Sequence, residues 1–349
     1  MEYTYLEHLK VLPQMSILET LPLLSRSTTD LLLLCKNDGE FVGTLSDSTI
    51  RQAVLDGVSF NEPCLKAADL NPMTASSQIS HSEAVHLMNG TTNHLPLVDS
   101  KGNLVNLLSC DNLAEEQSLP LTAVIMAGGF GSRLRPLTDN MPKPLLPLGD
   151  RPIMELIIGQ LRDAGIQNFY VTTHYLSEQI VDHFGDGRAF GVDITYVPED
   201  TPLGTGGALG LLEEQNRPLL VMNGDILTKL DFKAMWSFHR AHRAALTVAV
   251  RQYEYQVPYG VMESDGPYLR GLNEKPSYNF LVNAGIYLLE PSILHHIPTG
   301  QRFDMTDLMD TLLDNQLSVA TFPMIEYWLD IGQCADYEQA QEDMRAGKF

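Results

Sequence analysis

The order of apolar and polar positions divides the chain into two parts near residue 115. From residue 122 onward, short apolar runs alternate with stretches in which apolar residues recur at helical spacing. The apolar runs predict strands at 123–127, 169–173, 194–197, 219–223, 245–250 and 282–288. The helical stretches predict helices at 153–164, 177–184, 232–243 and 305–313. This alternation favours an α/β fold with a mainly parallel sheet covered on both faces.

The first part of the chain contains an internal repeat. Residues 31–55 and 94–113 each predict a strand, a polar turn with glycine, a second strand and the start of a helix. The turns that end in Gly39 and Gly102 are typical of hairpins. A polar segment that ends in Pro120 predicts a linker. We therefore expect an α+β domain at 1–115, a linker at 116–121 and an α/β domain at 122–349.

Composition and charge exclude several classes of protein. The chain has 349 residues, of which 44% are hydrophobic, and a formal net charge of −21. This charge argues against a nucleic-acid partner, whose binding would depend on Lys and Arg contacts to phosphates. The four cysteines show no C-x-x-C spacing, which predicts neither a zinc site nor a dithiol pair. With no signal peptide and no apolar run of membrane-spanning length, we expect a cytoplasmic protein that does not bind membranes.

A glycine-rich turn at 128–131 carries the strongest chemical signal. An apolar strand leads into it, and Arg133 and Lys143 follow. Glycines let their backbone N–H groups surround phosphate oxygens, and the two cations supply the matching charge. The turn lacks the third glycine of a dinucleotide fold, because Leu134 stands there, and no Gly-Lys-Ser/Thr of a Walker loop follows it. The pattern predicts a site for a nucleoside triphosphate.

Other segments place polar groups at the ends of strands. Asp225 follows an apolar strand and a glycine, and Asp330 lies near the end of the apolar run 327–332. Carboxylates of this kind suit Mg²⁺, which takes oxygen ligands and usually only one or two from the protein. The loop 199–209 holds three glycines and joins a strand to an expected helix, whose first N–H groups would be free to bind a ligand.

Residues 123–145 resemble the signature of the sugar-nucleotide pyrophosphorylases, and the resemblance extends from about Leu121 to near the C-terminus. It implies a Rossmann-like, GT-A-like nucleotidyltransferase domain that joins a sugar 1-phosphate to a nucleoside triphosphate and releases pyrophosphate. It further implies Mg²⁺ as the cofactor, held by Asp225 and Asp330.

The resemblance assigns roles to individual residues. The catalytic residues are Arg133, Lys143 and Asp225, with Arg133 on the leaving pyrophosphate and Lys143 beside the α-phosphate. The nucleotide-binding residues are Ala127, Gly128, Gly129, Gly131, Ser132, Gly204, Thr205 and Gly207. The residues that bind the sugar phosphate are Tyr259, Gly260, Glu274, Lys275 and Asn283, with Lys275 on the attacking phosphate.

The internal repeat resembles a tandem pair of cystathionine-β-synthase-type (CBS) modules. The cleft of such a pair often binds an adenine nucleotide and regulates a neighbouring enzyme. The aspartate that usually binds the ribose is replaced by Thr49 in the first copy and by Asn112 in the second. A structural or dimerising role is therefore equally open, and we expect a homodimer or a higher homo-oligomer.

The base and the sugar stay open at this level. The combination of a CBS pair with a short transferase domain resembles guanylyltransferases of surface-sugar pathways, which favours GTP with mannose 1-phosphate or an amino sugar 1-phosphate. The nucleotide sugar would then supply a cell-surface polysaccharide. One alternative is a uridylyl- or thymidylyltransferase that acts on a glucose-type 1-phosphate. Another is a nucleotide-sensing protein without catalytic activity.

Overall fold

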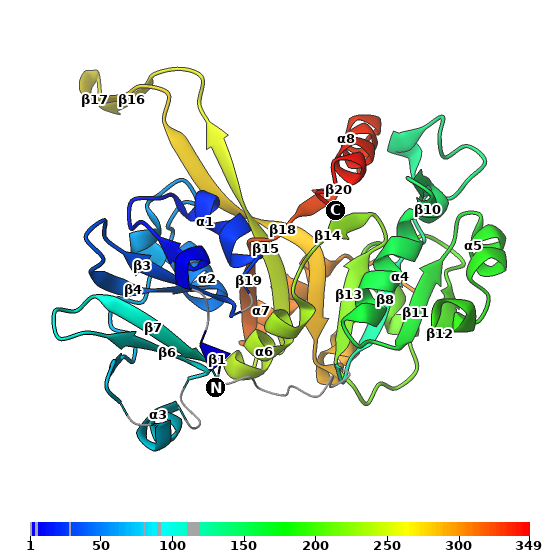
Figure 1. The fold of residues 1–349 in the computed structure, drawn as a ribbon. Coiled ribbons are helices and arrows are strands. Elements are labelled where there is room, and N and C mark those ends of the chain that lie inside the picture. The colour runs from blue at the N-terminus through cyan, green and yellow to red at the C-terminus, as the bar shows by residue number, and fades with distance from the viewer. Residues whose placement is uncertain (1, 4–5, 28, 80, 89–91, 110–118) are drawn as a thin grey trace. The chain divides into compact units, whose positions relative to one another are not determined.

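The computed structural model describes residues 2–3, 6–27, 29–79, 81–88, 92–109 and 119–349, and these form two compact units (Figure 1). Unit 1 comprises residues 1–115 together with 252–281, and unit 2 comprises residues 116–251 together with 282–349. Half of the predicted linker, residues 116–118, lies outside the described residues. The domain boundaries given above stay a prediction.

Unit 2 is built on a seven-stranded sheet. The strands, in order across the sheet, are β12 (Asp193–Pro198), β11 (Asn168–Thr173), β8 (Thr122–Met126), β13 (Leu219–Asn223), β18 (Ser277–Leu289), β15 (Leu246–Gln256) and β19 (Val319–Met324). β8 pairs in parallel with β11 and with β13, whereas β18 runs antiparallel to β13. The prediction of a mainly parallel sheet is confirmed, and β19 is the one strand of this sheet that it missed.

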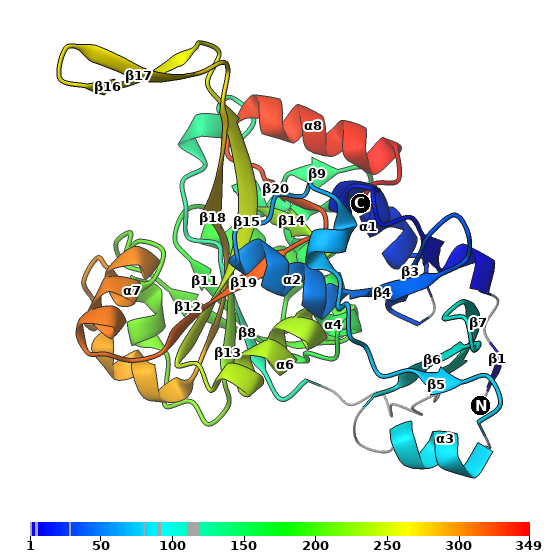
Figure 2. The ribbon, with the colours of Figure 1, turned by 90° about the vertical axis from the view of Figure 1, so that its left-hand side faces the viewer.

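Helices cover both faces of this sheet (Figure 2). They are α4 (Ile153–Asp163), α5 (Ser177–Phe184), α6 (Phe232–His242) and α7 (Met305–Asp314), whereas α8 (Cys334–Arg345) packs against the short strands at 328–330 and 147–148. Alternate side chains of β8 enter different cores, so that Ala123 and Ile125 contact the cluster of α4, α5 and α6 and Val124 contacts that of α7. Each fully buried Val, Leu or Ile contributes about 1.5–3 kcal/mol, which holds the strand ends in place.

Two short antiparallel pairs complete unit 2. β14 (Ile226–Thr228) pairs with β20 (Trp328–Asp330), and Ile226 lies opposite Asp330. β9 (Pro147–Leu148) pairs with β10 (Arg151–Pro152). The β14–β20 pair joins the segment after β13 to a strand about a hundred residues later. Of the two predicted metal-binding aspartates, Asp330 is the last residue of β20 and Asp225 directly precedes β14.

Unit 1 contains the two hairpins that the repeat predicts. One sheet has the order β2 (Lys10–Val11), β3 (Leu31–Cys35), β4 (Phe41–Ser46), and the other has the order β1 (Glu2–Tyr3), β7 (Leu104–Ser109), β6 (His94–Val98), β5 (Ala75–Ser76). The helices are α1 (Ile17–Leu24), α2 (Asp47–Leu55) and α3 (His81–Met88). Gly39 and Gly102 have φ of +91° and +86°, as the hairpin turns require. The helix start expected at 110–113 lies outside the described residues.

The segment 252–281 continues β15 and β18 beyond the sheet of unit 2. It also forms a hairpin of its own, β16 (Val261–Asp265) with β17 (Tyr268–Asn273). Hydrogen bonds tie its start to the first part of the chain, because Phe60 N donates to Gln252 Oε1 at 2.9 Å and Asn61 Nδ2 donates to Glu254 Oε2 at 2.8 Å. These bonds join the segment to the rest of unit 1.

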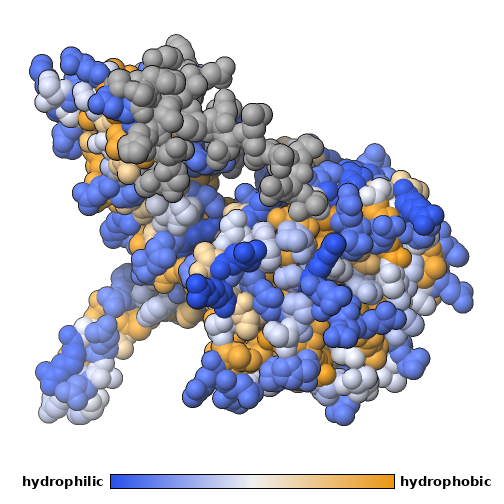
Figure 3. All heavy atoms as spheres, turned by 90° about the horizontal axis from the view of Figure 1, so that it is seen from below, coloured by the Kyte–Doolittle hydropathy of each residue, from blue (hydrophilic) through white to orange (hydrophobic). Residues whose placement is uncertain are grey.

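The surface seen in Figure 3 is a mixture of hydrophilic residues and scattered hydrophobic ones. None of the helices in the described part of the chain is long and apolar enough to cross a membrane.

One buried histidine of unit 2 makes the stability of the fold depend on pH. His239 of α6 is 1% exposed, its Nδ1 lies 2.7 Å from Thr247 Oγ1 and its Nε2 lies 3.3 Å from Glu290 Oε1. Burial lowers the pKa of His239, the Glu290 carboxylate opposes that shift and the Arg240 charge adds to it. The unfolded chain therefore takes up a proton below pH 6.5 that the folded chain does not.

We predict that the free energy of unfolding falls as the pH drops from 7.5 through 6.5, and that His239→Gln flattens this part of the profile. At pH 7.5 the same variant should lose about 1–3 kcal/mol, because its buried hydrogen bonds are altered. Urea unfolding followed by tryptophan fluorescence measures both effects. His242→Gln, on the same helix and exposed, is the control. An unchanged pH profile in His239→Gln would contradict the prediction.

Candidate active site

A pocket of about 390 Å³ lies at the carboxyl ends of the central strands of unit 2. Its lining includes Met126 at the end of β8, Thr172 near the end of β11 and Asn223 at the end of β13. Ligands of open α/β sheets bind at this edge of the sheet. The other lining residues are Gly128, Gly129, Phe130, Arg133, Glu199, Pro202, Leu203, Gly204, Thr205, Asp225, Arg302, Asp304 and Asp330.

The glycine-rich turn forms one wall of this pocket. A Cβ on Gly128 would lie 2.4 Å from Glu199 Oε1, so that a larger residue there would displace the Glu199 carboxyl group. Gly131 has φ of +61°, and a Cβ on it would lie 2.9 Å from Thr138 Cγ2. The Thr138 hydroxyl donates to the Gly131 carbonyl oxygen at 2.8 Å. The turn is thus held by its own chain, and its shape requires glycine at both positions.

A close ion pair joins the turn region to the end of β13. Lys143 Nζ lies 2.5 Å from Asp225 Oδ2, and the two side chains are only 12% and 22% exposed. Lys143 begins a single 3₁₀ turn, Lys143–Leu145, and it reaches the pocket through Asp225 rather than as part of the lining. Arg133 lines the same pocket. Two cations therefore lie where the sequence predicts the phosphates.

The two predicted metal ligands lie together in the structure. Ile331 N donates to the Asp225 carbonyl oxygen at 3.1 Å, and the β14–β20 pairing places Asp330 beside the same residue. Burial raises the pKa of Asp330, and the charge of Asp225 raises it further, whereas Lys143 and Arg133 act in the opposite direction. The two carboxylates therefore repel each other in a site that lacks full access to water.

The donor set of these aspartates fits Mg²⁺. Asp225 Oδ1 is buried and has no hydrogen-bond partner among the described residues, which leaves one hard oxygen available to a cation. In the described part of the chain, no group of three or more His, Cys, Asp or Glu side chains could hold a metal. Mg²⁺ needs no such cage, because phosphates and water complete its coordination.

The loop at 199–209 is clamped by a segment about a hundred residues later. Gly206 N and Gly207 N both donate to the Phe303 carbonyl oxygen, at 2.9 and 2.7 Å. Asp304 Oδ1 accepts from the N–H of Thr205 at 2.8 Å and from its hydroxyl at 3.2 Å. The loop leads into a 3₁₀ helix, Gly207–Leu211. The loop thus leads into a helix as expected, but the expectation that its first N–H groups are free was wrong for Gly206 and Gly207, whose N–H groups bond to Phe303.

Glu199 is a pocket residue to which sequence analysis gave no role. It lies directly after β12 and is buried, and its Oε2 accepts from the N–H of Leu203 at 3.0 Å. It forms no ion pair within the described part of the chain. Its signal in the sequence is only that of a polar residue at the end of a predicted strand, followed by a glycine-rich loop.

The structure brings together most of the predicted residues of unit 2. Those that line the pocket are Gly128, Gly129, Arg133, Gly204, Thr205, Asp225 and Asp330. The others are not part of the lining, namely Ala127, Gly131, Ser132, Lys143 and Gly207. Asn283 lies on β18, where its Nδ2 donates to the Tyr287 hydroxyl and its Oδ1 accepts from Gly285 N, both at 2.9 Å. Both of its polar atoms are thus engaged within the strand.

The remaining predicted residues belong to segment 252–281 of unit 1. Tyr259 is 75% exposed, and a Cβ on Gly260 would lie 2.9 Å from Glu274 Oε2. Lys275 has φ of +47°, an uncommon conformation for a residue with a side chain. Glu274 and Gly260 are therefore neighbours, as a shared sugar site requires, and the sugar-binding role of these residues stays a prediction.

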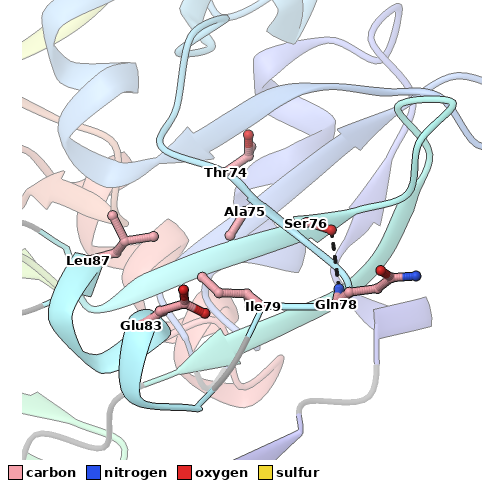
Figure 4. A pocket seen from close by; sticks show the side chains of 7 residues that line it. All are labelled: Thr74, Ala75, Ser76, Gln78, Ile79, Glu83 and Leu87. Carbon is pink, nitrogen blue, oxygen red and sulfur yellow. Dashed lines mark hydrogen bonds between the residues drawn. The ribbon is translucent and has the colours of Figure 1, made fainter.

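A second pocket, of about 670 Å³, lies in the second half of the repeat of unit 1 (Figure 4). Glu83 and Leu87 of α3 face it together with β5 and the residues beside that strand, and the remaining lining is Thr74, Ala75, Ser76, Gln78 and Ile79. Among the described residues, no Lys or Arg is part of this lining. In the first repeat, the Thr49 hydroxyl donates to the Ser46 carbonyl oxygen within the cap of α2, and Asn112 lies outside the described residues.

Comparison with known proteins relates both units to families. Residues 122–347 match the nucleotidyl transferase family, and residues 67–118 match the CBS domain. The chain is 34% identical over 242 residues to a UTP–glucose-1-phosphate uridylyltransferase of Synechocystis, and 31% identical over 234 residues to a mannose-1-phosphate guanylyltransferase of Mycobacterium tuberculosis. These alignments cover 63% and 64% of this chain, and 62% and 65% of the relatives.

The fold agrees with solved structures. HddC of Yersinia pseudotuberculosis is 26% identical, with a TM-score of 0.51, and the match covers 64% of this chain and 99% of that one. The family match extends over nearly two thirds of the 349 residues and includes the glycine-rich turn and both aspartates. The chain therefore belongs to the nucleotidyl transferase family, and it carries a CBS domain ahead of the nucleotidyl transferase domain.

Proposed function

We propose that the chain is a sugar-1-phosphate guanylyltransferase. In this reaction a phosphate oxygen of the sugar 1-phosphate forms a bond to the α-phosphorus of GTP. The bond from that phosphorus to the oxygen bridging to the β-phosphate breaks, and pyrophosphate leaves with the electron pair. A phosphate nucleophile is already anionic at neutral pH, so the site needs no general base. Its work is to position the reactants and to stabilise charge.

The observation that carries the proposal is the convergence of Arg133, Lys143, Asp225 and Asp330 around the glycine-rich turn. The N–H groups of the turn and the Arg133 guanidinium would hold the departing pyrophosphate. Lys143, fixed by Asp225 at 2.5 Å, would lie beside the α-phosphate, where charge builds up during transfer. A nucleotide-sensing protein without catalysis would not need this buried ion pair.

Asp225 Oδ1 and the Asp330 carboxylate would hold Mg²⁺, consistent with the buried unpartnered oxygen. When bound, the cation would neutralise phosphate charge and orient the reacting groups. Lys143 keeps the other oxygen of Asp225 engaged, which fixes the direction of the one left available.

The choice of base rests on Glu199. Its carboxylate is buried beside Gly128 in the pocket, and an ionised carboxylate can only accept hydrogen bonds. Guanine presents two neighbouring donors, N1–H and the N2 amino group, which would satisfy such an acceptor. Uracil and thymine present a single N3–H between two carbonyl oxygens, and a carboxylate repels those oxygens. The mannose-1-phosphate guanylyltransferase among the relatives is consistent with GTP, whereas the UTP–glucose-1-phosphate uridylyltransferase is consistent with the alternative base.

The proposal for the sugar substrate covers two classes of sugar 1-phosphate. Tyr259, Gly260, Glu274, Lys275 and Asn283 would bind mannose 1-phosphate or an amino sugar 1-phosphate, with Lys275 on its phosphate. We place the product in the synthesis of a cell-surface polysaccharide. For unit 1 we propose an adenine nucleotide in the CBS cleft and a homodimer. Thermal shift with AMP and ATP tests the first, and light scattering after gel filtration tests the second.

Asp225→Asn should lower kcat by about two to three orders of magnitude, because it removes a charged ligand of Mg²⁺ and the carboxylate that holds Lys143 in place. Pyrophosphate release from GTP and mannose 1-phosphate or glucosamine 1-phosphate, in the presence of Mg²⁺, measures it. Asp163→Asn is the matched control, because that carboxylate is 70% exposed on α4. Near-normal turnover by a folded Asp225→Asn enzyme would refute the metal assignment.

Glu199→Gln should lower kcat/KM for GTP by about 10- to 100-fold, because an amide replaces a charged acceptor. ITP, which lacks the N2 amino group, gives the specific readout. The wild type should prefer GTP to ITP, and the variant should lose most of this preference. Glu178→Gln, an exposed residue of α5, is the control. If the variant keeps the full preference for GTP over ITP, Glu199 does not recognise the base.

A further inference from the structure

Residues 301–305 pack against the glycine-containing part of the loop at 199–209, which lines the pocket. Besides the bonds from Gly206 and Gly207, Phe303 N donates to the Leu203 carbonyl oxygen at 2.8 Å. A Cβ on Gly207 would lie 2.6 Å from the Gln301 carbonyl oxygen, and one on Gly204 would lie 2.6 Å from Asp304 Oδ1. The backbone on both sides of Arg302 is therefore fixed against this loop.

Arg302 itself lines the pocket, although its side chain is 78% exposed. Within the described residues its ion-pair partner is Asp304, with Arg302 Nη2 3.7 Å from Asp304 Oδ2. That distance is longer than a hydrogen bond, and the other oxygen of Asp304 is engaged with Thr205. The N–H donors of Arg302 are thus available at the loop end of the pocket.

The surroundings of Arg302 favour a neutral, acceptor-rich partner over a phosphate. Asp304 lies beside it, and the Asp304 carboxylate would repel the oxygens of a phosphate placed there. The cations predicted to bind the phosphates are Arg133 and Lys143. Arg133 lines the pocket with the glycine-rich turn, and Lys143 is paired with Asp225. The base of the nucleotide presents carbonyl and ring-nitrogen acceptors without a negative charge.

We infer that Arg302 is a specificity-determining residue that donates hydrogen bonds to O6 and N7 of the guanine base. An arginine matches this pair of acceptors with two parallel N–H groups. Glu199, in the same pocket, would accept from N1–H and the N2 amino group on the neighbouring edge. The inference rests on the proposed guanylyltransferase function and extends it, because the guanidinium and the carboxylate together would contact every polar group that distinguishes guanine from adenine.

The test compares GTP with 7-deaza-GTP, in which a carbon replaces N7, on the full-length enzyme. The wild type should show about tenfold lower kcat/KM with 7-deaza-GTP, equivalent to one charge-assisted hydrogen bond. Arg302→Gln should lose about 10- to 100-fold with GTP and discriminate less than twofold between the two nucleotides. Arg302→Lys, which keeps the charge and loses the paired donors, should also lose discrimination.

Arg217→Gln is the control, because Arg217 is exposed beside Thr122, Asn168 and Asp193, at the opposite ends of the strands. The KM for pyrophosphate in the reverse reaction should not change in Arg302→Gln. A raised KM there would show that Arg302 binds phosphate and would overturn the inference. Equal discrimination in wild type and variant would overturn it too, while leaving the guanylyltransferase function standing. A wild type that releases no pyrophosphate from GTP would refute the function, and the inference with it.

Discussion

The ion pair between Lys143 and Asp225 is the contact on which the phosphate end of the pocket depends. It joins residues that are 82 positions apart and connects the segment after the glycine-rich turn to the end of β13. Because both side chains are largely buried, removing one partner would leave an uncompensated charge, at a cost of about 3–5 kcal/mol in comparable proteins. The backbone of Asp225 in turn holds Ile331, and so brings Asp330 into place. One contact thus fixes a cation and two carboxylates relative to each other.

The glycines of the site allow other segments of the protein to pack closely against them, as well as allowing a ligand to approach. In the sequence, the glycines at 128–131 and 204–207 suggest room for a nucleotide. In the structure, a Cβ on Gly128 would meet the Glu199 carboxyl, and a Cβ on Gly204 would meet Asp304. A Cβ on Gly207 would meet the backbone of Gln301. Each glycine therefore lets a second segment reach the pocket, and those segments bring Glu199, Arg302 and Asp304.

This explains which parts of the site sequence analysis could and could not find. The strands were predictable because buried parallel strands are continuous apolar runs, and Asp225 and Asp330 stand out at the ends of such runs. Arg302 and Asp304 were not, because they act through a contact with residues about a hundred positions away and have no local pattern. The role of Asn283 stays a prediction, since its motif predicts a sugar ligand and its side chain bonds to Tyr287 and Gly285 within β18.

The charges that line the pocket bear on how a nucleotide enters it. The lining contains two arginines and four carboxylates, namely Arg133 and Arg302, and Glu199, Asp225, Asp304 and Asp330. Lys143 adds one further cation, but that charge is paired with Asp225. A nucleoside triphosphate carries several negative charges, and the whole chain carries a net charge of −21. Binding to such a surface is electrostatically unfavourable unless cations accompany the ligand. The unpartnered oxygen of Asp225 provides the point of attachment for one, so nucleotide and divalent cation are expected to bind as a unit, and metal dependence should already appear in nucleotide affinity, before any chemistry takes place.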